Sequence, residues 1–273
     1  MPEGDTVLNA TDDLVRNLCP NGKWMILVNA FKCSDSFNQV NLNLLVPALN
    51  QPIVDLFCKG KEYFLVLGNG VSIRAHCGMA GHWSMVHSNA ANFNANTQIQ
   101  FPSSTHFRFD FSNDDNTKFL TLLFVNERFG EFEIFSTIQQ LQTSVDRIAS
   151  SFIGRYILTL EEWRINFNSF TDRKSLRAAM LDQKELCSGI GNFLLAEIMY
   201  YAKLHPDATI GTVKAIPNGI DNLYHLCKTV VEGFYTGRLD KIIYNKKECI
   251  RGHPVSHSKK GGRTAWYCNT CLM

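Results

Sequence analysis

The chain begins Met1-Pro2-Glu3-Gly4, and its second residue could do chemistry. Proline is ordinary in the first turn of a helix, because it has no backbone N–H to leave unsatisfied. A small second residue also usually allows removal of Met1, which would leave Pro2 with a free secondary amine. A terminal amine has a pKa of about 8, against about 10.4 for lysine, so it is a nucleophile near neutral pH. Such an amine can form a Schiff base with a carbonyl-like carbon, whereas a helix start explains neither Glu3 nor Gly4.

The end of the chain carries a pattern typical of metal ligands. Cys249 and His253 are followed by Cys268 and Cys271, which gives Cys-x3-His and Cys-x2-Cys with fourteen residues between them. Two thiolates at this spacing can grip one zinc ion through a tight turn, and the other cysteine and the histidine supply two more tetrahedral positions. A segment this short has almost no core, so the metal would supply much of its folding free energy. Scattered free cysteines are the alternative, and His257 is an alternative ligand to His253.

Two further positions could hold phosphate. Arg263 lies five residues before Cys268, where a two-stranded zinc ribbon would turn, and an arginine there could clamp phosphate bidentately. In "SGIGN" the glycines let the backbone approach closely, and Asn192 begins a helix whose N–H groups could bind phosphate, with charge added by Lys184. The plainer alternatives are a solvated surface arginine and a simple tight turn.

The first half of the chain has the periodicity of a helix followed by a β-sandwich. Apolar residues fall at helical spacing over residues 7–18. Short runs rich in β-branched and aromatic residues then alternate with turn signals, which predicts strands and hairpins. The expected strands lie within residues 23–31, 53–67, 71–76, 106–113, 118–125 and 131–135. Phe107, Phe109 and Phe111 alternate with polar neighbours, which predicts a half-buried strand.

The second half of the chain returns to helical periodicity. Helices are expected within residues 160–170, 172–183, 192–204 and 219–237. The Asn-rich residues 88–100 are interpreted as a mobile loop. The predicted fold class is therefore α+β in several domains. They are an N-terminal helix plus β-sandwich in 1–140, a helical domain in 141–245 and a β-hairpin zinc finger in 246–273.

Composition and charge limit the class of protein. The 273 residues, 45% of them hydrophobic, can form a large core. The longest apolar runs are too short to span a bilayer and no charged-then-apolar leader precedes the fold, so we expect an intracellular protein with no membrane partner. From Arg238 onward eight Lys/Arg stand against two Asp/Glu, a net of +6, while the preceding 237 residues carry −4. A basic C-terminal module suggests a phosphate-rich partner.

These motifs together resemble the formamidopyrimidine-DNA glycosylase/endonuclease VIII (Fpg/Nei) family of base-excision repair enzymes. The resemblance spans nearly the whole chain and rests on five separated elements in the family's order. They are Pro2-Glu3-Gly4, Lys61 within "KGK", "AHCGMAGHW" (75–83), "DQKELCSGIGN" (182–192) and "GRTAWYCNTC" (262–271). The resemblance implies a helix–two-turn–helix domain between the β-sandwich and the zinc finger.

The resemblance also implies an activity and its requirements. We expect a bifunctional DNA glycosylase and AP lyase that contains one structural zinc ion. Its partner would be damaged DNA, single-stranded, bubble or duplex, and the protein would be a monomer associated with DNA in the nucleus or an equivalent compartment. No redox cofactor or catalytic metal is expected.

The resemblance implies three catalytic residues. Pro2 would attack C1′ of the damaged nucleotide, and Glu3 would assist proton transfers at the opening sugar. Lys61 would hold phosphates near that sugar, with a plain β-hairpin lysine as the alternative. An iminium at C1′ would acidify C2′, so that β-elimination and then δ-elimination break the strand and release the sugar. Lys61 and Arg263 nearby would keep the Pro2 amine unprotonated.

The resemblance implies a set of DNA-binding residues as well. They are Met79, Arg128, Phe129, Lys184, Asn192 and Arg263. Met79 would enter the gap left by the extruded base, although by itself it would more often belong to a core. Phe129 would be a wedge beside the opposite base. Asn192 and Arg263 would pinch the phosphates that flank the lesion, bending the duplex so that the base flips.

Two departures from the family pattern bear on the substrate. The Fpg branch usually has a further arginine, facing the orphaned cytosine, where this chain has Glu127. A carboxylate cannot replace that donor pair, which argues against a specialist for 8-oxoguanine opposite cytosine. The Cys-His-Cys-Cys pattern with "CIRGHPV" is similar to that of the animal and large-virus Nei-like subgroup, which acts on oxidised pyrimidines and hydantoins and favours bubbles or single strands.

Two rival functions remain. A non-catalytic nucleic-acid-binding protein could also contain helix–turn and zinc elements, but a pure binder has no reason to keep Pro2, Glu3 and Lys61 together. An AP lyase that lacks base excision is the second rival, and the sequence does not separate it from a glycosylase.

Overall fold

The structure is a computed structural model that describes residues 4–37, 39–78, 81–90, 92–93, 102–127, 130–260 and 262–272. The chain divides into two compact units. The first contains Val7–Asp146, and the second contains Arg147–Met273 together with Glu3–Thr6. Each unit has its own hydrophobic core.

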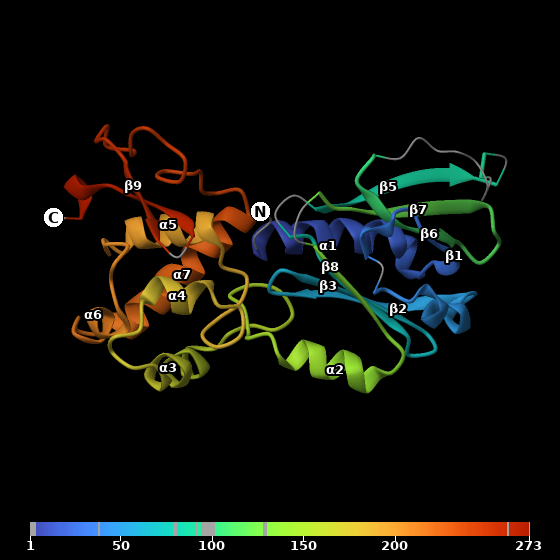
Figure 1. The fold of residues 1–273 in the computed structure, drawn as a ribbon, viewed down its shortest axis with the longest axis horizontal. Coiled ribbons are helices and arrows are strands. Elements are labelled where there is room, and N and C mark those ends of the chain that lie inside the picture. Colours follow the sequence, from blue (N-terminus) through green and yellow to red (C-terminus); the bar gives the residue numbers. More distant parts are fainter. Residues whose placement is uncertain are drawn as a thin grey trace. The chain divides into compact units, whose positions relative to one another are not determined.

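The first unit is a β-sandwich with an N-terminal helix (Figure 1). Its elements are α1 (Gly4–Leu18), β1 (Ile26–Lys32), β2 (Gln51–Lys59), β3 (Glu62–Leu67), β4 (Ser72–His76), β5 (His82–Asn89), β6 (Thr105–Ser112), β7 (Lys118–Val125), β8 (Glu131–Phe135) and α2 (Ile138–Asp146). The strand order is β5-β7-β6-β1-β2-β3-β4-β8, and all neighbours are antiparallel. Because only two residue pairs join β1 to β2, the sheet folds into two layers of four strands.

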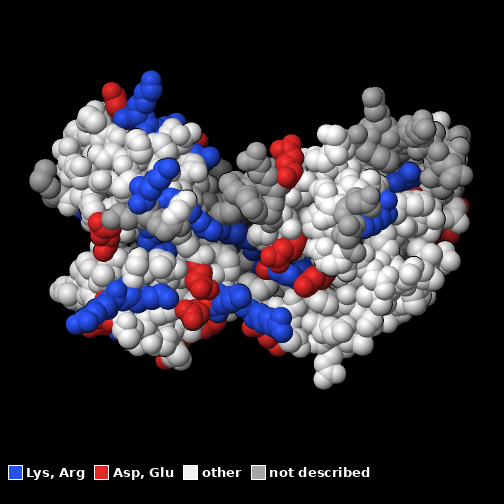
Figure 2. Space-filling view, in the orientation of Figure 1, with Lys and Arg blue, Asp and Glu red and all other residues white. Residues whose placement is uncertain are grey.

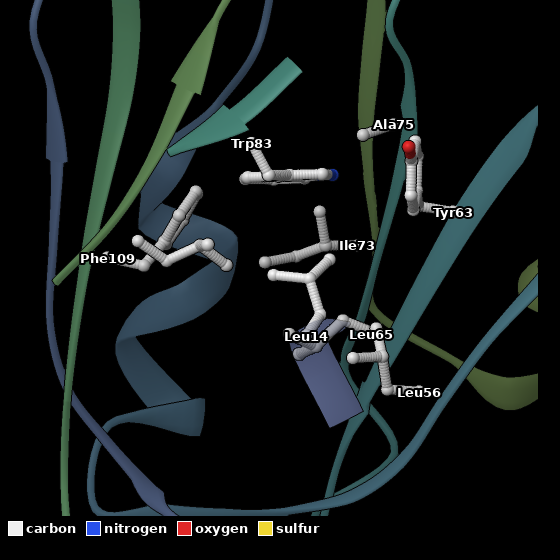
Figure 3. A pocket seen from close by; sticks show the side chains of 9 residues that line it. Leu14, Leu56, Tyr63, Leu65, Ile73, Ala75, Trp83 and Phe109 are labelled. Carbon is white, nitrogen blue, oxygen red and sulfur yellow. The ribbon is translucent and has the colours of Figure 1, made fainter. Parts of the chain in front are cut away.

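The core of the sandwich lies between these layers and α1. Val7, Leu14 and Leu18 recur along one side of α1 and are buried, as the helical spacing predicts. Figure 3 shows Leu14 below a space that Phe109 and Trp83 line from one layer and other apolar residues line from the other. This void measures about 10 Å³, which makes it a packing defect and not a ligand site.

Two features of the sandwich differ from the sequence prediction. β5 was not expected, because it lies beside the Asn-rich stretch interpreted as a loop. β6 was expected to be half-buried, but all eight of its residues are buried. On its polar face two charged groups are buried as a pair. Arg108 pairs with Asp110 at 2.8 Å, and the Thr121 hydroxyl donates to the same carboxylate at 2.7 Å.

The second unit is helical and ends in a β-hairpin. Its elements are α3 (Leu160–Ser169), α4 (Leu176–Leu181), α5 (Asn192–Tyr201), α6 (Ile210–Lys214), α7 (Gly219–Tyr235), β9 (Ser256–Lys260) and β10 (Arg263–Tyr267). Side-chain oxygens of Thr159, Ser175 and Thr209 cap the N-termini of α3, α4 and α6. The Trp163 indole, fully buried, donates to the Ile220 carbonyl at 3.0 Å and so joins α3 to α7.

The predicted α+β fold class is confirmed, with α4, residues 182–191 and α5 in the place of the expected helix–two-turn–helix. The boundary expected at residue 140 falls inside α2, which was not predicted as a helix. The Lys59 ammonium donates to the Val145 carbonyl at 3.0 Å, which attaches the end of α2 to the first unit. The hairpin belongs to the same compact unit as the helices. The division into 1–140, 141–245 and 246–273 stays a prediction.

Candidate functional site

The start of the chain packs against the loop before α5, within the second unit. The Gly4 N–H donates to the Gly189 carbonyl at 2.8 Å. A Cβ added at Gly4 would lie 2.7 Å from the Gly189 Cα, closer than real Cβ contacts come. Gly189 itself has a φ of +89°, which L side chains rarely adopt. The chain therefore needs glycine at both positions. Pro2 and Glu3 lie outside the described residues, so their roles stay predictions.

The side-chain amide of the half-buried Gln183 shapes the loop that Gly4 contacts. The Gln183 carbonyl oxygen accepts from the Gly189 N–H at 2.8 Å, and its NH₂ group donates to the Leu181 and Ile190 carbonyls, each at 3.0 Å. Ser188 adds a bond from its N–H to the carbonyl of Ser150 at 2.9 Å. Turn backbone has no ladder to satisfy it, so these side-chain bonds determine the path of residues 181–190.

Asn192 begins α5 and is held by two neighbours. Its NH₂ group donates to the Thr264 carbonyl at 2.8 Å, and its carbonyl oxygen accepts from the Arg177 guanidinium at 2.6 Å. Because a guanidinium only donates and a carbonyl only accepts, these partners decide which way the amide faces. The network joins α4, α5 and β10, so the first turn of α5 is held beside the strand that Arg263 begins.

Arg177 and Arg263 concentrate positive charge at this place. Arg177 is 5% exposed, whereas Arg263 is exposed. Burial lowers the pKa of Arg177, and the positive charge of Arg263 lowers it further. Among the described residues neither arginine belongs to an ion pair. Two cations beside a helix N-terminus, with no carboxylate on them, favour an anion as ligand.

Sequence reasoning missed Arg177. A clue was present, because Arg177 lies between the apolar residues Leu176 and Ala179 on a short helix that buries most of its surface. Arginine is seldom buried unless it is paired, so its position in "SLRAAML" could have marked it. Lys184 is exposed on the 182–191 loop, and its N–H donates to the Asp182 carboxylate at 2.9 Å.

Lys61 belongs to the first unit and follows Gly60 at the β2–β3 turn, where Gly60 has a φ of 60°. A lysine on a hairpin turn is ordinarily exposed, but Lys61 is only 5% exposed. Burial lowers the pKa of His76 on β4, and the charge of Lys61 acts on it in the same direction. The burial argues against a plain hairpin lysine, since lysine is rarely buried without a role for its charge.

Three predicted DNA-binding residues, Met79, Arg128 and Phe129, lie outside the described residues, so the structure does not place them. Glu127, directly before them, is exposed. Figure 2 shows Lys and Arg side chains on the face of the second unit that is turned toward the viewer, with acidic side chains among them.

The four predicted metal ligands come together. The Sγ atoms of Cys249, Cys268 and Cys271 and a ring nitrogen of His253 all lie within 4.8 Å of one another. Cys249 Sγ and Cys271 Sγ are 3.8 Å apart, and His253 Nδ1 is 3.3 Å from Cys271 Sγ. Two thiolates bound to one tetrahedral zinc ion at about 2.3 Å would be separated by about 3.8 Å. The donor set and its spacing therefore fit zinc.

Two tight turns and a small core hold this cluster. The Gly252 N–H donates to the Cys249 carbonyl at 2.8 Å, and the Cys271 N–H donates to the Cys268 carbonyl at 3.2 Å. Burial by itself raises the pKa of Cys249, but N–H groups of Arg251 and His253 lower it to about 6. A thiolate at this position suits metal binding.

His257 is not part of the cluster, which decides between the two histidines. It lies on β9 opposite Trp266 of β10, and their ring centroids are 5.3 Å apart. The cluster contains His253, the histidine that was chosen from the sequence.

No protein-family model matches the chain. It is 26% identical over 250 residues to the formamidopyrimidine-DNA glycosylase of Zymomonas mobilis. The aligned residues cover 82% of this chain and 83% of that relative. The fold is similar to that of Lactococcus lactis Fpg (MutM) bound to DNA containing an AP site, with a TM-score of 0.77, 18% identity and coverage of 97% and 98%. The fold is also similar to that of the L. lactis Fpg complex with DNA containing an oxidised pyrimidine, with a TM-score of 0.79, 17% identity and coverage of 99% of each chain.

Within the described residues no helix combines the length and the apolar character needed to cross a membrane. The similar proteins do not distinguish the Nei-like subgroup. Curated relatives named formamidopyrimidine-DNA glycosylase are nevertheless similar to this chain along most of its length, and the solved structures share its fold over nearly all of it.

Proposed function

We propose that this protein is a bifunctional DNA glycosylase and AP lyase of base-excision repair. It removes oxidised pyrimidines and hydantoins, and it accepts single-stranded or bubble DNA. The observation that carries the proposal is the hydrogen bond from Gly4 to Gly189, which holds the residue two positions after Pro2 against the loop that leads into Asn192. The names of the relatives and the DNA in the similar solved structures support it.

The Pro2 amine is the nucleophile of this reaction. It attacks C1′ of the damaged nucleotide as the glycosidic bond breaks, and the base departs with the bonding electrons. The amine then loses its proton, and its lone pair forms the iminium as the C1′–O4′ bond breaks and Glu3 donates a proton to O4′. The resulting iminium acidifies C2′. Loss of a C2′ proton breaks the C3′–O bond, and a second elimination breaks the C5′–O bond. Lys61, buried in the first unit, holds a phosphate near the sugar and lowers the pKa of the amine by its charge.

The second unit supplies the phosphate grip. Asn192 at the start of α5 and Arg263 at the start of β10 hold the phosphates that flank the lesion, and Lys184 adds charge from the preceding loop. Arg177 extends the predicted set, because its bond to Asn192 orients the amide. Met79 enters the gap that the flipped base leaves, Phe129 is a wedge beside the opposite base, and Arg128 contacts the DNA.

Zinc has a structural part in this proposal. Cys249, His253, Cys268 and Cys271 would hold one ion, which would cross-link the two ends of the hairpin segment. The zinc-bound hairpin presents Arg263 and the Thr264 carbonyl that Asn192 contacts. As a monomeric enzyme on chromosomal DNA, the protein acts inside the cell.

A covalent intermediate tests the nucleophile. Borohydride should trap a protein–DNA adduct on an abasic-site oligonucleotide, and Pro2→Gly should weaken trapping because its terminal amine is primary and more flexible. An extension that blocks the terminus should abolish both trapping and cleavage. An equally active protein whose extension is shown by mass spectrometry to be intact would overturn the proposal. Trapping without release of any damaged base would favour the AP lyase that lacks base excision.

Gly4→Ala tests the packing of the chain start. A Cβ at Gly4 would meet the Gly189 Cα at 2.7 Å, so the backbone must move. A misplacement of about 1 Å can reduce a rate by about 10², and we expect a loss of that order in single-turnover cleavage. Thr6→Ala, at an exposed position of the same turn, is the matched control and should cleave like the wild type. Wild-type cleavage by Gly4→Ala would contradict the packing argument.

Metal analysis tests the ligand set. We expect one zinc ion per chain, measured by mass spectrometry of the purified protein. Alanine at Cys249, His253, Cys268 or Cys271 should release it, because each supplies one donor atom of the cluster. His257→Ala should retain it, since His257 contacts Trp266 instead. Zinc lost by His257→Ala but kept by His253→Ala would show that the wrong histidine was chosen.

Glu127 sets an expectation for substrate range. The wild type should excise 8-oxoguanine opposite cytosine weakly and should excise thymine glycol and hydantoins better, because an exposed carboxylate offers no donors to the orphaned cytosine. Glu127→Arg should raise the ratio of 8-oxoguanine to thymine glycol excision. Glu127→Gln should change this ratio less, because it removes the charge but does not add the paired N–H donors of a guanidinium. Wild-type rates that are equal on both lesions would contradict this assignment.

A further inference from the structure

Asn126 is a buried amide that contacts two separate turns of the first unit. It lies between β7 and β8 and is 4% exposed. Its NH₂ group donates to the Cys77 carbonyl at 2.8 Å, and its carbonyl oxygen accepts from the Gly130 N–H at 3.2 Å. One side chain therefore bonds the end of β4 and the start of β8 at the same time.

The Cys77 carbonyl also closes its own turn. It accepts from the Gly81 N–H at 2.7 Å, so the two ends of the segment 77–81 meet at one oxygen atom. Asn126 donates to that same oxygen. Cys77 and Gly81 are thus joined to Asn126 and Gly130 through two groups, the Cys77 carbonyl and the Asn126 amide.

Glycines on both segments make room for this amide. A Cβ added at Gly81 would lie 2.3 Å from Asn126 Nδ2, and a Cβ at Gly130 would lie 2.2 Å from the same atom. Both distances are far below any real Cβ contact, and Asn126 is too buried to move aside freely. Gly81 in "GMAG" and Gly130 in "RFG" are therefore explained by one side chain packed between them.

The main chain of Asn126 is held as firmly as its side chain. Its N–H donates to the Ser104 carbonyl at 3.0 Å, and its carbonyl accepts from His106 Nε2 at 2.6 Å. Because a carbonyl only accepts, Nε2 of His106 carries the hydrogen, and in the neutral ring Nδ1 is left to accept from the Ser34 hydroxyl. Ser34, His106 and Asn126 form one chain of bonds that begins after β1.

We propose that Asn126 is a positioning residue that holds the segments 77–81 and 126–130 together as one unit for opening duplex DNA. Methionine and phenylalanine are side chains that proteins insert between base steps, and these segments carry Met79 and Phe129 in the sequence. The inference rests on the proposed function, and Asn126 acts through these segments and not on the reacting atoms.

The proposal predicts a defect confined to duplex DNA. A single strand has no opposite base and no gap to fill, so cleavage of an abasic site in a single strand should not depend on how these segments are held. Asn126→Ala should reduce single-turnover cleavage of the same site in a duplex about tenfold or more relative to the single strand, because small misplacements at a site are costly. General destabilisation would lower both rates together.

Asn126→Asp refines the test. It keeps the volume and the acceptor for the Gly130 N–H but loses the donor to the Cys77 carbonyl. Hydrogen exchange should then quicken at the Gly81 amide and stay near wild type at Gly130, whereas Asn126→Ala should quicken both. Asn113→Ala, at a turn between β6 and β7 in the same unit, is the matched control and should leave the duplex-to-single-strand ratio unchanged.

Base opening gives a readout that stability does not move. With 2-aminopurine opposite the lesion, the wild type should raise the fluorescence on binding, and both Asn126 variants should raise it less at saturating protein. An unchanged duplex-to-single-strand ratio in variants that have lost the exchange protection would overturn the inference. A wild type that cleaves neither DNA form would instead refute the proposed function, so the two failures are distinguishable. If an Asn126 variant is too unstable to cleave a single strand, Gly130→Ala takes its place. Its ratio of duplex to single-strand cleavage should fall in the same way, and an unchanged ratio would overturn the inference.

Discussion

A close backbone approach in the second unit decides what the chain start can do. A hydrogen bond of 2.8 Å between Gly4 and Gly189 leaves no space for a side chain on Gly4. A terminal amine is useful for catalysis only if its position is reproducible, and chain termini are usually poorly ordered unless they are tied down. Helix α1 and the Gln183-shaped loop together supply that restraint. The requirement for glycine at residue 4 follows from the backbone contact and not from the conformation of Gly4 itself.

The position of the hairpin is set by contacts with the helical residues as well as by its cluster of metal-ligand residues. Glu197 on α5 is fully buried, and its carboxylate accepts from the N–H groups of Ile242, Ile243 and Tyr244 at 2.9–3.1 Å. Hydrogen bonds to a charged group contribute about 1.5–3 kcal/mol each, and a buried carboxylate without them would be strongly unfavourable. Ile243 is buried beside the cysteines of the cluster. The segment that leads into the hairpin is therefore held against α5.

Periodicity predicted the elements well where apolar residues determine them. The strands around Phe64 and Phe109 and the helices around Trp163 and Leu195 were located by pattern, because each buries one regular face or more. Spacing also located the Cys-His-Cys-Cys cluster, since short turns bring residues that are close in sequence together. The bonds of Gln183, Arg177 and Asn126 were not predictable, because each joins segments whose contact is set by tertiary packing. β6 was misjudged for a related reason, since Asp110 is buried with Arg108 and Thr121 as its hydrogen-bond partners.

Buried and half-buried polar side chains hold most of the loops to which function is assigned. Gln183 shapes the turn before α5, Arg177 orients the first residue of α5, Asn126 joins two turns of the sandwich, and Glu197 fixes the segment before the hairpin. Loop backbone has no ladder of its own, and directional bonds can fix it while its outer side stays free for a ligand. Removing one such side chain leaves buried groups unsatisfied at a cost of about 1–3 kcal/mol. Because a domain is stable by roughly 5–15 kcal/mol, such a loss can displace one loop while the cores remain folded, and function at that loop is then more sensitive to these residues than the fold is.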